Sequence, residues 1–158
     1  MADRIWRSCT YRSGARADDE WPCPVVVTAR DYGDVSEILA YVAGAVIAVW
    51  GVAHTIPTGR VLAGFEPVTA ENRRIVLQEW LAEAFTMWGV AAVVIVVAAT
   101  GGSDTGAGVW VYRVAAALLV ALGTLTALTG ARTGVVWFKI CPVLLAGSAV
   151  LLVVASVL

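Results

Sequence analysis

The sequence predicts an all-α integral membrane protein, an up-and-down four-helix bundle, on three observations. Hydrophobic residues make up 59% of the 158-residue chain and charged residues only 15%, against roughly 25% charged in soluble domains. Four apolar stretches, at about 37–55, 80–100, 109–129 and 135–157, approach the roughly 20 residues that cross a bilayer as a helix. None alternates polar and apolar residues as a barrel strand does, so helices must satisfy the backbone groups in lipid.

The chain is expected to hold one folded unit, residues 35–158, because short polar turns separate the apolar stretches. Residues 1–34 lack the apolar core of a signal peptide and are expected to form a disordered tail. Part of this tail could be an artefact of a wrongly assigned translation start, since each valine at 25–27 could be encoded by an alternative GTG start codon. The cysteines have no metal-binding spacing and predict no disulfide framework: Cys9, Cys23 and Cys141.

Local patterns predict where the helices begin and end. Asp34 and Glu37 have the spacing of a capping box, so the first helix is expected to begin near Ser36. Thr69 is a candidate N-cap for a long helix that ends near Ala99 and begins with about ten polar residues. Glycine-rich segments at 101–106 and 130–134 predict tight turns, which would place consecutive helices side by side.

The distribution of arginine predicts the orientation in the membrane. Loops 57–79 and 130–134 contain Arg60, Arg73, Arg74 and Arg132, whereas Arg30 alone lies close to a span on the other side. The positive-inside rule therefore predicts that these two loops are cytoplasmic and that both termini are outside, in a bacterial inner membrane. Four arginines in the tail oppose this assignment: Arg4, Arg7, Arg12 and Arg16.

Several polar residues should gather at the loop 57–79 interface, because the first span ends there and the second and fourth begin there. Glu79 and Glu83 lie four residues apart, on one helix face. Ionisable groups in a bilayer are costly and are functional candidates by default. Ordinary interfacial roles remain open, since the fourth-span lysine could snorkel. The candidate ligand- or proton-binding residues are His54, Glu79, Glu83, Lys139, Thr58 and Trp50, and Cys141 lies nearby.

His54 is the only histidine in the sequence, which limits its possible chemistry. A zinc or haem site would need further ligands that the chain does not offer in a recognised pattern, so neither metal nor cofactor is required by the sequence. A pair between His54 and a carboxylate could serve as a proton relay, anchor a ligand headgroup, or be purely structural. The segment 57–68 could close over this cluster as a lid, or anchor the second span at the interface.

A different cluster is expected at the opposite interface, where Arg113 begins the third span. We expect Arg113 to pair with Glu37 as a structural ion pair. Small residues spaced by four predict close helix packing, at Ala40, Gly44 and Ala48 and at Gly123 and Ala127. Interfacial belt positions are predicted for Trp80, Trp110 and Trp137, whereas Trp88 could pack in the core and Pro142 could kink the fourth span.

Two motifs give the chain a resemblance to a known group. His54-Thr-Ile-Pro-Thr58 ends the first span, and Glu66-Pro-Val-Thr-Ala-Glu-Asn-Arg-Arg74, followed by Glu79-Trp80, enters the second. With its four spans, the chain from about residue 38 onward resembles small uncharacterised bacterial four-span membrane proteins, loosely the DoxX group. The resemblance implies the four-span fold, a membrane location and an association with respiratory or thiol-redox chemistry. No catalytic motif of that group can be transferred to residues of this sequence.

Two classes of function follow. One is a non-enzymatic accessory or ligand-binding subunit, with a polar pocket at the cytoplasmic interface for a quinone, lipid or similar amphipath. The alternative is a small dimeric proton-coupled transporter that uses Glu83. An enzyme is less favoured, because no nucleophile elbow, metal-binding HExxH motif or other catalytic constellation occurs. The expected partners are membrane lipid and either a second copy or a larger membrane complex. Arg73 and Arg74 favour an anionic membrane surface over nucleic acid.

Overall fold

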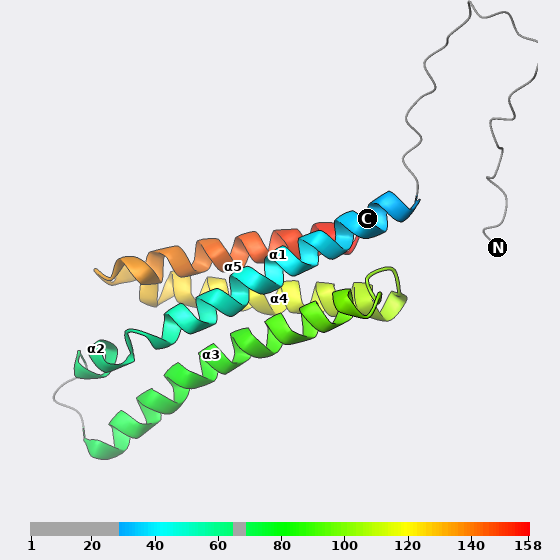
Figure 1. The fold of residues 1–158 in the computed structure, drawn as a ribbon. Helices are drawn as coiled ribbons and strands as arrows, with labels where there is room; N and C mark the ends of the chain where they lie inside the picture. The colour runs from blue at the N-terminus through cyan, green and yellow to red at the C-terminus, as the bar shows by residue number, and fades with distance from the viewer. Residues whose placement is uncertain (1–28, 65–68) are drawn as a thin grey trace, which may run out of the picture.

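A computed structural model describes residues 29–64 and 69–158. Within these ranges the chain is helical and has no strand (Figure 1). The predicted all-α four-helix fold is therefore confirmed, whereas the predictions for residues 1–28 lie outside the described residues. The elements are α1 (Ala29–Thr55), α2 (Thr58–Ala63), α3 (Ala70–Ala99), α4 (Gly106–Leu128), the 3₁₀ turn η1 (Gly130–Arg132) and α5 (Val136–Ala155).

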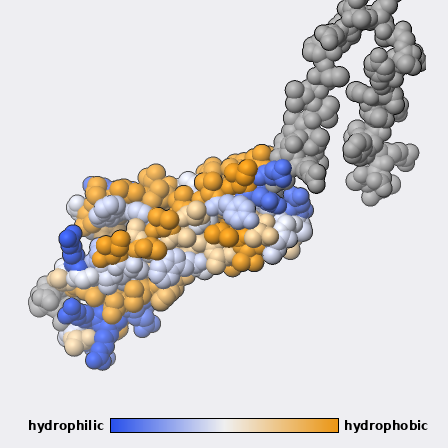
Figure 2. Space-filling model, in the orientation of Figure 1, coloured by the Kyte–Doolittle hydropathy of each residue, from blue (hydrophilic) through white to orange (hydrophobic). Residues whose placement is uncertain are grey.

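The four long helices have the length and composition of membrane spans. Candidate spans cover Asp34–Thr55, Ala70–Ala99, Gly106–Arg132 and Val136–Ala155. On the face shown in Figure 2, hydrophobic side chains cover much of the middle, and hydrophilic ones gather toward the two ends. Such a surface is costly in water but suits the hydrocarbon core of a bilayer. The chain is thus a multi-pass membrane protein.

Two of the predicted helix boundaries can be compared with the structure directly. The Thr69 hydroxyl accepts a hydrogen bond from the Asn72 amide at 3.2 Å, so Thr69 is the N-cap of α3 as predicted. The predicted start of the first helix near Ser36 is wrong, because α1 begins at Ala29. Ser36 instead donates a buried hydrogen bond of 2.8 Å to the carbonyl oxygen of Ala155. The capping-box spacing therefore lies inside a continuous helix, which also crosses the predicted boundary between residues 34 and 35.

Helix α1 packs against both α3 and α5, and α4 packs against α5. Small residues allow the close approach of α1 to α3: a Cβ atom at Gly44 would lie 2.7 Å from Ile95 Cγ1, and one at Gly51 would lie 2.6 Å from Trp88 Nε1. The packing role predicted for Gly44 is confirmed. Gly123 likewise approaches α5, where its added Cβ would lie 3.5 Å from Leu145 Cβ.

Helices α3 and α4 meet near the turn that joins them and then diverge toward the α2 end of the molecule (Figure 1). The expected adjacency of this pair therefore holds only in part. The tight turn itself is present, and Gly101 adopts a positive φ of 66° there, a conformation that glycine adopts without steric cost. Side chains of both helices, among them Ala82 and Thr86 of α3 and Leu122 and Leu125 of α4, line an opening between them, which we call the α3–α4 seam.

Candidate ligand-binding site

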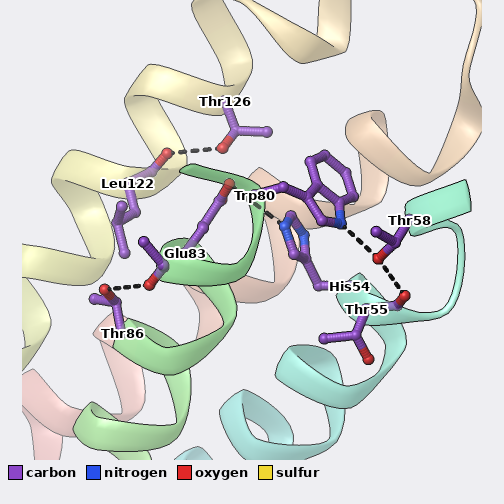
Figure 3. A network of polar contacts seen from close by, with 9 residues as sticks. His54, Thr55, Thr58, Trp80, Glu83, Thr86, Leu122 and Thr126 are labelled. Carbon is purple, nitrogen blue, oxygen red and sulfur yellow. Dashed lines mark hydrogen bonds and ion pairs between the residues drawn. The ribbon is translucent and has the colours of Figure 1, made fainter. Parts of the chain in front are cut away.

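The end of α1 and the first half of α3 bring His54, Trp80 and Glu83 together (Figure 3). The rings of His54 and Trp80 stack with their centroids 4.0 Å apart and an interplanar angle of 20°. His54 Nε2 lies 3.6 Å from Glu83 Oε2. Residues three apart on a helix share a face, so Trp80 and Glu83 can both contact the one imidazole.

A second set of contacts fixes Trp80 from the side of α2. The indole Nε1 of Trp80 donates a hydrogen bond of 3.1 Å to Thr58 Oγ1, and the Thr58 hydroxyl donates to the carbonyl oxygen of Thr55 (Figure 3). Phe138 of α5 meets the Trp80 ring edge-on, with centroids 5.7 Å apart. Trp80 is therefore held by contacts with α1, α2 and α5, although it belongs to α3.

These side chains border a cavity of about 320 Å³ at the α2 end of the bundle. We call it the head cavity. Its size falls at the lower end of the range that is usual for small-molecule sites. Its walls are largely aromatic and aliphatic, and they come from α1, α2, α3, α5 and the residues next to them: Trp50, Ala53, His54, Ile56, Pro57, Arg60, Val61, Trp80, Val135, Trp137, Phe138 and Cys141.

Two buried nitrogens of the head cavity have no hydrogen-bond partner of ordinary geometry among the described residues: Trp50 Nε1, which faces the Cys141 thiol, and His54 Nε2. Trp50 is 9% exposed and His54 is 8% exposed. The 3.6 Å between His54 Nε2 and Glu83 Oε2 brings the two groups into electrostatic contact but is too long for a hydrogen bond. An unsatisfied buried donor typically costs about 1–3 kcal/mol. The cavity therefore offers polar groups that a bound molecule could satisfy.

The sequence-predicted site residues fall into two sets. His54, Glu83, Thr58 and Trp50 belong to the cavity or to the contacts that shape it. Glu79 is exposed and lines only the outer opening of the seam. Lys139 is also exposed and does not line the cavity.

Sequence reasoning missed the role of Trp80, for which it predicted an interfacial belt position. Trp80 is only partly exposed and forms one face of the His54 stack. Two signals pointed in this direction: Trp80 lies three residues before Glu83, and His54 ends the preceding span. The segment 57–68 contributes Pro57, Arg60 and Val61 to the cavity wall, and its residues 65–68 lie outside the described part of the chain.

The predicted ion pair between Arg113 and Glu37 is not formed in the structure. Among the side chains of residues 34–64 and 69–158, the one ion pair within 4.0 Å is that between His54 and Glu83. Arg113 instead directs its Nε toward Ser156 Oγ at 3.4 Å and places its guanidinium 5.5 Å from the centre of the Trp110 ring. Contact with an aromatic face stabilises a cation without a carboxylate, which is the physical reason that the pair does not form.

Metal binding finds no support in the described residues, which contain no group of three or more histidine, cysteine or acidic side chains able to hold an ion. Cys141 is a free, buried thiol. Comparison with family models, curated proteins and solved structures finds no match. The DoxX-like resemblance therefore stays a prediction.

Proposed function

We propose that this chain is a non-enzymatic membrane subunit that binds an amphipathic molecule, such as a quinone or a lipid, with the headgroup of that molecule in the head cavity. The observation that supports this most directly is the pair of buried, unpartnered nitrogens in a cavity with aromatic walls. Flat aromatic walls favour a planar or apolar group. The two nitrogens offer hydrogen bonds that would fix its orientation.

The contacts around Trp80 support a binding role because they keep the cavity open without a ligand. The Trp80 ring is stacked on one face, hydrogen-bonded at Nε1 and contacted at its side by Phe138. A wall held by three other elements loses little conformational freedom when a ligand binds, and this lowers the cost of binding. The matching role for Glu83 is electrostatic, because its carboxylate lies 3.6 Å from His54 Nε2.

The location that we propose is a bacterial inner membrane, with the head cavity at the cytoplasmic interface. Arg60 belongs to α2 and Arg132 to the η1 turn, and these two elements lie at the same end of the bundle (Figure 1). Arg73 and Arg74 lie in the exposed first turns of α3. The positive-inside rule assigns such an arginine-rich end to the cytoplasm. We expect membrane lipid to surround the chain. A second copy of the chain, or a larger complex, would contact it within the same membrane.

The test is native mass spectrometry of the detergent-extracted full chain, which detects small molecules that copurify with it. Trp50→Phe keeps an aromatic ring but removes the Nε1 donor, and we expect it to lower ligand occupancy by roughly five- to tenfold, the value of about one hydrogen bond. Trp110→Phe is the matched control, because Trp110 is exposed and belongs to α4, which contributes no residue to the cavity wall. A wild-type chain that retains no amphipath would overturn the proposal.

A proton-coupled transporter is the second candidate, favoured by the contact between the partly exposed Glu83 carboxylate and a buried imidazole. Binding of a substrate could change the protonation state of the His54–Glu83 pair. Purified protein in liposomes that contain a pH-sensitive dye distinguishes the candidates. Proton flux that Glu83→Gln abolishes, and that Glu71→Gln at an exposed position on the same helix leaves intact, would favour the transporter. Ligand retention without flux would favour the binding subunit.

A further inference from the structure

The α3–α4 seam widens into a groove of about 900 Å³ beside the head cavity. Its α3 wall includes Ile75, Val76 and Ala82, and its α4 wall includes Leu122 and Leu125. The groove is formed where α3 and α4 diverge (Figure 1). It is more open than the cavity, and in a bilayer it faces the hydrocarbon and interfacial region.

The groove and the head cavity share part of their walls. Seven residues line both: Pro57, Arg60, Val61, Trp80, Val135, Trp137 and Phe138. The two spaces therefore adjoin at a shared wall that includes the aromatic side chains of Trp80 and Phe138, which are in edge-to-face contact. A molecule with its head in the cavity and its chain in the groove would lie across these rings.

The side chains of the head cavity that can form strong hydrogen bonds are mainly hydrogen-bond donors. The Trp50 indole and the Arg60 guanidinium can only donate hydrogen bonds, and His54 Nε2 has no hydrogen-bond partner among the described residues. Among the described residues no carboxylate lines this cavity, since Glu79 and Glu83 line only the groove. A head that accepts hydrogen bonds, such as a carbonyl group, is therefore matched to the donors of the cavity.

We infer that the α3–α4 groove is the subsite for the apolar chain of the ligand, and that the ligand enters sideways from the bilayer between α3 and α4, with a hydrogen-bond-accepting head leading. This inference rests on the proposed function, because it places the second half of the molecule whose head occupies the cavity. The groove supplies the tail with aliphatic contacts from two helices. The aromatic pair at the junction separates the acceptor head from its chain.

The experiment uses the full chain in lipid nanodiscs and a photoactivatable probe, a palmitate methyl ester with a diazirine in its chain. Mass spectrometry maps the cross-linked peptides. We expect cross-links within residues 75–86 of α3 and 122–125 of α4. The same diazirine chain without the ester, a plain hydrocarbon, should give roughly tenfold fewer cross-links at these positions, because it offers no hydrogen-bond acceptor to the donors of the cavity.

Ala82→Trp fills the groove from α3 with an indole, and we expect it to reduce the groove cross-links roughly tenfold. Ala92→Trp is the matched control, since Ala92 is an exposed residue of the same helix that does not line the groove. Leu122→Trp narrows the groove from α4 and gives a second, independent variant. Cross-linking that both groove variants leave unchanged would overturn the inference.

The outcomes also separate this inference from the proposed function. If the wild-type chain retains an amphipath in native mass spectrometry but its cross-links spread evenly over the lipid-facing helices, the tail subsite is wrong and the head cavity stands. If no amphipath is retained, the proposed function fails. Equal labelling by the ester and the hydrocarbon probes would contradict the acceptor-head assignment alone.

Discussion

At the scale of single residues, Gly51 sets the distance between α1 and α3. A Cβ atom there would lie 2.6 Å from Trp88 Nε1 and 2.8 Å from Trp88 Cδ1. The same Nε1 donates a hydrogen bond of 3.2 Å to the carbonyl oxygen of Ala48. Gly51 is therefore needed for a contact that joins the two helices three residues before His54.

We predict that Gly51→Ala destabilises the bundle by about 1–3 kcal/mol, the usual cost of overpacking. The added methyl must displace the Trp88 indole and weaken its hydrogen bond. Gly89→Ala is the control, since a Cβ there meets nothing within 4 Å, and alanine is a better helix former than glycine by up to about 1 kcal/mol. Thermal unfolding in detergent should show a lower Tm for Gly51→Ala only. A Tm that rises in both variants would contradict the prediction.

At the scale of secondary-structure elements, α2 is joined to the bundle by few polar contacts. It has six residues and no buried side chain. The hydrogen bond from Trp80 Nε1 to Thr58 Oγ1 links its first residue to α3. Helices this short are not stable in isolation, so this contact is expected to contribute to the order of α2.

We predict that Thr58→Val increases hydrogen exchange at the backbone amides of residues 61–64, because valine keeps the shape of threonine but cannot accept the Trp80 hydrogen bond. Thr55→Val is the control, since the Thr55 hydroxyl bonds only within its own helix, to the carbonyl oxygen of Val52. Hydrogen–deuterium exchange with mass spectrometry measures the difference. Equal protection in wild type and Thr58→Val would show that the helix is held by other contacts.

How far the sequence predicts these elements depends on the range of the interaction involved. Hydropathy and the Thr69 cap locate α3 correctly because both are local properties. The order of the spans also predicts that His54 and Glu83 meet, because the first span ends and the second begins at one interface. The stacking of Trp80 on His54 depends on the axial register of α1 against α3, a tertiary property that no local pattern encodes. The expected partner of Arg113 fails for a similar reason, because a carboxylate and an aromatic ring compete for one cation.

At the scale of the whole molecule, the proposed orientation makes a topological prediction. Alkaline phosphatase, which is active only outside the bacterial cytoplasm, should be active when fused at Leu158 and inactive when fused after Arg132. Green fluorescent protein, which folds in the cytoplasm, should give the reverse pattern. The reasoning is that the arginine-rich end of the bundle is retained inside. An active phosphatase after Arg132 would reverse the orientation and place the head cavity outside.

The length of α3 has a mechanical consequence. Its 30 residues span about 45 Å, more than the roughly 30 Å of hydrocarbon. The helix is pinned to α1 near Trp88, and the segment from there back to Ala70 is about 27 Å long at 1.5 Å per residue. Trp80, ten residues into this segment, is also held by α1, α2 and α5. A force applied to the protruding first turns of α3 would therefore be passed directly to the wall of the space beside His54.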